Sequence, residues 1–218
     1  IFGLLGALVY YGRRTGSSQT YRQALQYAVD RDKMVKEYFE GRQEVAHSWL
    51  PPKHYGYDPN VAKYAYDPKK AAALLEEAGW KKGEGGVRVN AKGEPLEITI
   101  ITTAGNKVRE NIEQILKAQW KRIGVQLKID NQEAQVFFGT TLPQRKYPHM
   151  AMYAWTMDPV SDGENLWTET QIPSEKNGWV GQNTPGFRNQ EIDRIDHEIP
   201  VTLDRAKRVE LFKQEQAI

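Results

Sequence analysis

The sequence predicts an α/β fold in which a mixed, mostly parallel sheet is flanked by helices. An apolar run at residues 96–102 (LEITIIT) is followed by a helical pattern at residues 106–123 and a second apolar run at residues 125–129 (VQLKI). Strand, helix and strand with short joints imply a right-handed crossover between parallel strands. The uncharged run at residues 150–155 predicts a third strand, buried on both faces. We therefore expect at least three strands to share one sheet.

The remaining elements follow from helical spacing and from capping residues. Residues 19–41 predict one long helix that ends at a glycine. In the next helix Asp67 is the expected N-cap, Pro68 fits the first turn because it lacks an N–H, and Gly79 ends the helix. Residues 87–93 favour an edge hairpin. Three further helices are expected at residues 134–145, 189–198 and 203–217.

The 218-residue chain has the composition of a soluble, folded protein, with 39% hydrophobic and 27% charged residues. Its formal net charge is only +2 and it has no dense basic block, which argues against nucleic acid as a partner. The lack of cysteine excludes disulfides, zinc–thiolate sites and cysteine nucleophiles. No cofactor is expected. Metal-ligand spacing is absent from the four histidines, His47, His54, His149 and His197.

Both ends of the chain predict a piece of a longer protein. Residues 1–11 (IFGLLGALVYY) carry no charge, but this run as a helix spans only about 16 Å, less than the ~30 Å of a bilayer core. Basic residues follow the run instead of preceding it, unlike a complete signal peptide. The final helix stops in the middle of its pattern. We therefore treat residues 1–20 as an atypical N-terminal segment.

The best candidate site lies where the third predicted strand ends. Pro159 has no N–H for a ladder and pushes Asp158 toward an extended conformation, so the strand stops there. Trp155 and Asp158 therefore stand at the carboxyl end of a strand, where ligands of open α/β sheets usually bind. The alternative is structural, with Trp155 in the core and Asp158 as a turn or cap residue.

Several segments have the order and spacing of a known family. They are residues 21–35 (YRQALQYAVDRDKMV), 64–80 (YAYDPKKAAALLEEAGW), 96–129, 153–159 and 205–217. Together they resemble the C-terminal lobe of solute-binding protein family 5, the substrate-binding proteins of peptide and nickel ABC importers. The resemblance implies one lobe of a two-lobe periplasmic binding protein of type II, like the dipeptide- and oligopeptide-binding proteins. Residues 21–218 would form this lobe, incomplete at its C-terminus.

The resemblance also implies a function without catalysis. The chain would belong to a component that captures di- or oligopeptides for transmembrane uptake and delivers them to the permease subunits of an ABC importer. We expect a monomer in the periplasm or outside the cell, associated peripherally with the membrane.

Four residues are assigned to the ligand site through the resemblance. In peptide-binding members, the carboxylate at the position of Asp158 meets the peptide's α-ammonium and the indole at Trp155 helps to wall the pocket. Thr103 and Asn106 stand after the first strand, where some dipeptide-binding relatives place an arginine for the peptide carboxylate. Arg109 is close by but is expected on the helix. Backbone N–H groups at the start of that helix offer another site for an anionic group.

Other interpretations stay open. The ligand could be a non-peptide solute in the same family, an oligosaccharide or a nickel chelate. A hydrolase would need a second catalytic group converging on Asp158, and the sequence nominates none. The amides at residues 181–184 could hold a ligand, but an ordinary loop whose amides bond its own backbone is the preferred interpretation. The acids at residues 76–77 and between Asp193 and Asp196 are explained by solvated helix faces.

Overall fold

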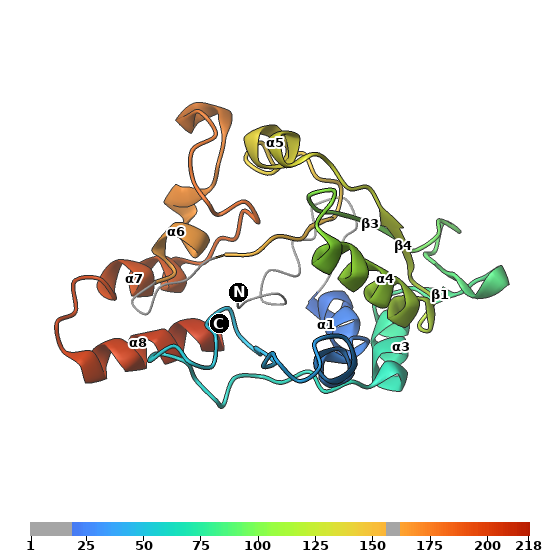
Figure 1. Ribbon diagram of the computed structural model, residues 1–218, viewed down its shortest axis with the longest axis horizontal. Helices are drawn as coiled ribbons and strands as arrows, with labels where there is room; N and C mark the ends of the chain where they lie inside the picture. Colours follow the sequence, from blue (N-terminus) through green and yellow to red (C-terminus); the bar gives the residue numbers. More distant parts are fainter. Residues whose placement is uncertain (1–18, 156–161) are drawn as a thin grey trace.

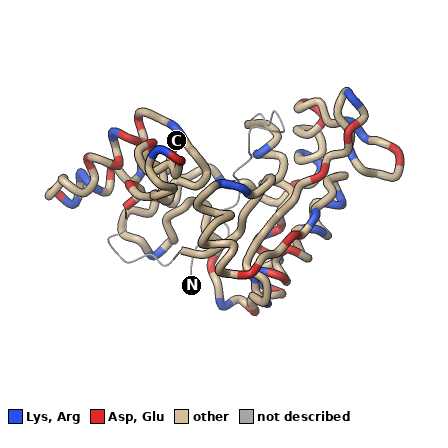
Figure 2. Tube along the Cα trace, turned by 90° about the horizontal axis from the view of Figure 1, so that it is seen from above, with Lys and Arg blue, Asp and Glu red and all other residues tan. Residues whose placement is uncertain are grey.

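The computed structural model describes residues 19–155 and 162–218, and Figure 1 shows two groups of helices at opposite ends of the molecule. One group surrounds the sheet and contains α1, α3 and α4; the other contains α6, α7 and α8. Over the described ranges, no helix is both long enough and apolar enough to cross a membrane. In Figure 2, basic and acidic residues alternate along the helices of both groups.

The central sheet confirms the predicted crossover. Strand β3 (Glu97–Ile101) lies between β4 (Gln126–Ile129) and β5 (Met150–Ala151), and both pairings are parallel. The third strand is shorter than the six residues predicted. After Met152 donates its N–H to the carbonyl of Ile101 at 2.9 Å, the chain leaves the sheet. The apolar run therefore continues beyond the strand without regular secondary structure.

A two-stranded antiparallel ladder makes the fold mixed. It pairs β1 (Lys81–Lys82) with β2 (Arg88–Val89), and Val89 also bridges Pro95 in the antiparallel sense. The edge hairpin was predicted at residues 87–93, and only β2 of this ladder falls inside that range.

The predicted long helix at residues 19–41 is broken. Helix α1 (Gln19–Tyr27) ends before Asp30, and α2 (Arg31–Lys33) continues into the π-helical turn η1 (Met34–Tyr38). Asp30 starts the second helix, because its carboxylate accepts the N–H of Lys33 at 2.9 Å. Its own N–H donates to the side-chain oxygen of Gln119 at 3.0 Å. A hydrogen bond to a residue 89 positions later in the chain thus stabilises the break between α1 and α2, which helical spacing does not predict.

Two of the longer helices begin directly after a side-chain cap, and the first of these caps was predicted from the sequence. Helix α3 (Pro68–Glu77) follows Asp67, whose side chain accepts the N–H of Lys70 at 2.9 Å. Helix α4 (Lys107–Lys121) follows Asn106, which accepts the N–H of Arg109. The other described helical elements are η2 (Glu84–Gly86), α5 (Ala134–Val136), η3 (Phe137–Thr141), α6 (Glu164–Trp167), η4 (Glu169–Gln171), η5 (Glu175–Asn177), α7 (Gln190–Glu198) and α8 (Arg205–Ala217). The last two confirm the predicted C-terminal helices, whereas the helix predicted at residues 134–145 is shorter and partly π-helical.

Two main cores match the two helix groups. The larger core packs the sheet against α1, α3 and α4, with Leu25, Leu75, Ile98, Ile100, Ile112, Leu116, Trp120 and Leu127 among its buried residues. The smaller one joins α7 and α8 to the long connection before α3, through Leu50, Ile195, Ile199, Leu211 and Phe212. Gly56 lies so close to the Phe212 ring that a Cβ at this position would overlap it. The aromatic connection is therefore packed, although it has no regular structure.

Candidate functional site

Functional candidates gather at the carboxyl edge of the parallel sheet. Thr103 follows β3, Gln132 follows β4, and Trp155 comes four residues after β5. Thr103 and Gln132 form a parallel bridge, which extends the β3–β4 pairing to the edge. Asp158, the predicted partner of the ligand's ammonium group, lies outside the described residues.

Thr103 and Asn106 are brought together around Arg109. The Arg109 guanidinium donates to the hydroxyl of Thr103 at 2.8 Å, while the Asn106 side chain accepts the backbone N–H of Arg109 at 3.2 Å. Partial burial lowers the pKa of Arg109. Arg109 lies on α4, as predicted, and its side chain reaches back to the edge of the sheet. This cluster places a cation beside both predicted residues.

The N-terminus of α4 is less open to an anion than its sequence suggests. The N–H of Arg109 is used by the Asn106 cap, and the N–H of Gly105 donates to a carboxylate oxygen of Glu110 at 2.8 Å. Glu110 also receives a hydrogen bond from Lys107. Side chains of the chain itself therefore occupy donors that an anionic ligand would need.

An aromatic row leads to Trp155. The Tyr153 ring packs edge-on against Phe138 at 6.2 Å and against Trp155 at 5.9 Å between ring centroids. Tyr153 is buried, Trp155 is half-buried, and Phe138 remains 46% exposed. Trp155 thus packs against a small core and also has solvent-exposed surface. The structural interpretation and the functional interpretation of this residue are therefore compatible. The sequence did not single out Phe138, because its pattern is that of an ordinary amphipathic helix.

The loop at residues 181–184 contributes structure through Asn183. Its side-chain N–H groups reach the carbonyls of Trp167, Thr168 and Phe187, each at 2.9 Å. Asn183 is fully buried, so its amide is not offered to a ligand. The ordinary-loop interpretation is confirmed for this residue. Its neighbour Thr184 contacts the aromatic row, a role without a sequence signal because Tyr153 lies 31 residues away.

Glu113 is a buried acid beneath the same edge. One of its oxygens accepts a hydrogen bond from Asn131 at 2.7 Å, and Asn131 in turn accepts the N–H of Thr102 at 3.0 Å. The other carboxylate oxygen of Glu113 is buried without a hydrogen-bond partner. Burial raises the pKa of Glu113 to about 7; the bond from Asn131 opposes this shift, and the charge of Glu110 adds to it.

We expect Glu113→Gln to stabilise the protein above neutral pH. The folded-state pKa of Glu113 lies above its unfolded value, so its contribution to stability is lost as the pH rises from about 4.5 to 7. The amide keeps the shape and does not ionise. At pH 8 the free energy of unfolding should rise by about 1–2 kcal/mol, with little change at pH 4.5. Urea unfolding at both pH values tests this against Glu97→Gln, an exposed acid on β3. A variant that is equally stabilised at both pH values would contradict the explanation.

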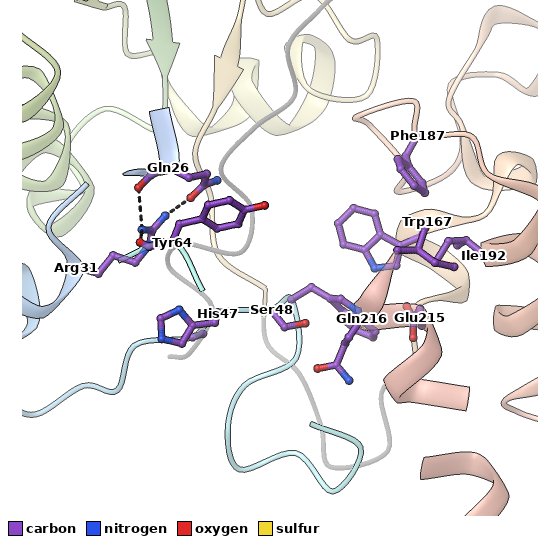
Figure 3. A pocket seen from close by; sticks show the side chains of 13 residues that line it. Gln26, Arg31, His47, Ser48, Tyr64, Trp167, Phe187, Ile192, Glu215 and Gln216 are labelled. Carbon is purple, nitrogen blue, oxygen red and sulfur yellow. Dashed lines mark hydrogen bonds between the residues drawn. The ribbon is translucent and has the colours of Figure 1, made fainter. Parts of the chain in front are cut away.

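A cavity of about 290 Å³ lies away from this edge, between the two helix groups (Figure 3). On one side, the rings of Trp49 and Trp167 pack edge to face at 6.2 Å. On the other, Arg31 hydrogen-bonds to both the carbonyl and the side chain of Gln26. The remaining described lining residues are Ala46, His47, Ser48, Tyr64, Phe187, Ile192, Glu215, Gln216 and Ile218. The predicted residues Trp155, Thr103 and Asn106 are not among them.

A metal centre is not assembled by the described residues, in which no three His, Asp or Glu side chains converge on one point. Two of the histidines accept backbone N–H groups through Nδ1. His54 accepts from Gly56 at 3.1 Å, and His149 accepts from Thr99 at 3.0 Å. These two imidazoles therefore take part in structural hydrogen bonds.

Comparison with known proteins finds one family model and several relatives that match most of this chain. The profile of the bacterial extracellular solute-binding proteins, family 5 Middle, matches residues 13–175. The dipeptide-binding protein of Escherichia coli K12 is 31% identical over 201 residues, which cover 90% of this chain and 34% of that relative. The chain spans about a third of the length of the curated relatives that it matches.

Solved structures give the same result. The oligopeptide-binding protein from Thermus thermophilus, complexed with a pentapeptide, has a TM-score of 0.84 and 36% identity, covering 91% of this chain and 35% of that one. NikZ from Campylobacter jejuni, in complex with Ni(L-His), has a TM-score of 0.78 and 26% identity, covering 92% of this chain and 39% of that one.

Proposed function

Because this chain belongs to family 5 of the bacterial extracellular solute-binding proteins, we propose that it is part of the substrate-binding component of an ABC importer that captures peptides. The observation that carries the proposal is the similarity, at 36% identity, to an oligopeptide-binding protein complexed with a pentapeptide. The α/β fold with its parallel sheet is that of the type II binding proteins of this family. In the proposal, residues 21–218 are most of one lobe, residues 1–20 are an atypical segment, and a second lobe closes over the ligand.

The proposed ligand site is the carboxyl edge of the sheet. Asp158 accepts the ammonium group of the peptide and Trp155 forms a wall beside it, while Thr103 and Asn106 line the edge near Arg109. A charge-assisted hydrogen bond contributes about 1.5–3 kcal/mol when water is excluded, against about 0–1 kcal/mol for an exposed ion pair. The difference explains why the site needs a second lobe. The half-buried Trp155 and the exposed part of Phe138 support a wall that is completed by the ligand.

The family consists of solute-binding proteins, and we infer that this chain captures its ligand without catalysis. The proposed protein is a monomer in the periplasm or at the outer cell surface, associated peripherally with the membrane where it meets the permease subunits. A hydrolase built on Asp158 remains the contrasting hypothesis, and hydrolysis of a bound peptide over hours would support it.

A second ligand class has one specific observation in its favour. NikZ, a structural relative at 26% identity, was solved with Ni(L-His). The described residues do not converge into a set that would chelate a metal directly. A nickel complex would therefore be recognised through the small molecule that carries the metal. An oligosaccharide is the other non-peptide solute to be tested.

We expect Asp158→Ala to weaken peptide binding about 10- to 150-fold, because it removes the acceptor for the ammonium group. Trp155→Ala should weaken binding by about 0.5–2 kcal/mol through loss of the ring face beside the cation. Native mass spectrometry of the intact two-lobed protein would identify co-purified peptides, and calorimetry with those peptides would measure the affinities.

Glu210→Ala serves as the control, since it removes an exposed acid on α8 that pairs with Lys213. Wild-type affinity in the Asp158 variant would refute the ammonium site. Binding of sugars or nickel complexes without any binding of peptides would refute the peptide proposal itself.

A further inference from the structure

Trp155 is connected to a distant loop through the side chain of Tyr153. The Tyr153 hydroxyl lies 3.2 Å from the hydroxyl of Thr184, within hydrogen-bond distance. The Tyr153 ring packs edge-on against the indole of Trp155, at 5.9 Å between ring centroids. Burial raises the pKa of Tyr153, which keeps the phenol protonated and able to donate.

Thr184 is itself held in a fixed position. It is 5% exposed, and its carbonyl accepts hydrogen bonds from the Tyr147 hydroxyl at 2.9 Å and from Arg145 at 3.0 Å. Arg145 also donates to the carbonyl of Pro185 at 3.3 Å, and it approaches Gly186 so closely that a Cβ there would overlap the guanidinium. Together with the buried Asn183 amide on its other side, these contacts make the loop a rigid support.

The orientation of the Tyr153 ring affects the position of Trp155. The ring of Trp155 packs at 64° to that of Tyr153, so a small rotation of Tyr153 about its ring axis would move the edge against which the indole rests. Because Trp155 is only half-buried, its orientation depends on the few side chains that it contacts, and the ring of Tyr153 is one of them.

We propose that Thr184 is a positioning residue for ligand recognition: its hydroxyl orients Tyr153, and Tyr153 fixes the face that Trp155 turns toward the ligand. This inference rests on the proposed function in placing Trp155 in the ligand wall. Thr184 acts through Tyr153 and does not touch the ligand. The loop after η5 thereby sets the shape of a site that lies about thirty residues earlier in the chain.

The test combines a ligand-free and a ligand-bound measurement on the intact protein labelled with 5-fluorotryptophan. The signal of Trp155 is assigned from Trp155→Phe. Thr184→Val removes the hydroxyl and keeps the shape; it should shift and broaden the Trp155 resonance and weaken peptide affinity about 3- to 10-fold. Thr184→Ser should restore both. Tyr153→Phe should reproduce the defect, and the double variant with Thr184→Val should be no worse than Tyr153→Phe alone.

Thr202→Val is the matched control, because its hydroxyl bonds the carbonyl of Glu198 on the far helix pair. An unchanged Trp155 resonance in Thr184→Val overturns the inference, whether or not affinity falls. Additive losses in the double variant also overturn it. If wild-type protein binds no peptide, the proposed function fails while the fluorine signal still decides the link between Thr184 and Trp155.

Discussion

Trp120→Ala is expected to lower the free energy of unfolding by about 3–5 kcal/mol. Trp120 is only 2% exposed and lies in the larger core between α4, α1 and the sheet. Its indole N–H donates to the carbonyl of Leu25 at 3.3 Å, so the substitution also leaves a buried acceptor without its partner. The loss therefore combines a large cavity with a broken link between two helices.

Urea denaturation followed by far-UV circular dichroism measures this effect. Val108→Ala provides the control on the same helix, because Val108 is 43% exposed and its truncation should change the free energy by less than about 0.5 kcal/mol. Trp120→Phe should recover part of the loss by filling the cavity. A Trp120→Ala variant within about 1 kcal/mol of wild type would mean that this end of the molecule does not depend on the α1–α4 contact.

Glu215→Gln is expected to stabilise the protein at alkaline pH by about 2–3 kcal/mol. Glu215 on α8 and Asp196 on α7 are buried, and their carboxyl groups lie beside the same residue, Gly163. No N–H group or hydroxyl in the described part of the chain donates to their oxygens. Gly163 packs directly against both carboxyl groups, since a Cβ there would overlap them.

The direction of this pH dependence follows from the causes of the two pKa shifts. Burial first, and then the charge of Asp196, raise the pKa of Glu215 above its unfolded value. Burial likewise raises the pKa of Asp196, with the acids Asp162, Asp193 and Glu164 adding to the effect. Folding thus retains protons that the unfolded chain releases, and stability falls as the pH rises through and beyond neutrality. Glutamine removes one titration and can donate to Asp196.

Thermal unfolding between pH 4 and pH 9 separates this account from simple repacking. The difference between the variant and the wild type should be smallest at pH 4, close to the unfolded-state pKa of both carboxyl groups, and should grow as the pH rises. Glu210→Gln is the control on the same helix, because Glu210 is exposed and paired with Lys213. A wild-type protein whose stability increases from pH 7 to pH 9 would contradict a protonated pair.

The sequence led to the opposite expectation for Asp196. Its helical position suggested a solvated face, whereas the side chain is fully buried. Helix α7 packs against both α8 and α6. The helical spacing of its apolar residues therefore does not identify its solvent-exposed face. The prediction was wrong because polar residues mark a solvated face only when a helix packs on one side.

Local chemistry along the sequence was enough to predict several parts of this protein. Asp67 was predicted as a helix cap because its side chain can satisfy a nearby N–H group, and it accepts the N–H of Lys70. The short joints around α4 predicted that β3 and β4 pair in parallel, as they do. The order of the motifs identified the family. The interactions behind these signals join residues that are close in the sequence, so a single sequence is enough to reveal them.

Features that depend on distant contacts emerge only in the folded molecule. Gln119 helps hold the break in the first predicted helix, and Thr184 meets Tyr153 from a loop without a motif. The burial of Glu215 beside Asp196 likewise arises only when α7 and α8 pack together. Hydrogen bonds and desolvation depend on atoms within a few ångströms in space, and the spacing of residues along the chain does not encode that distance.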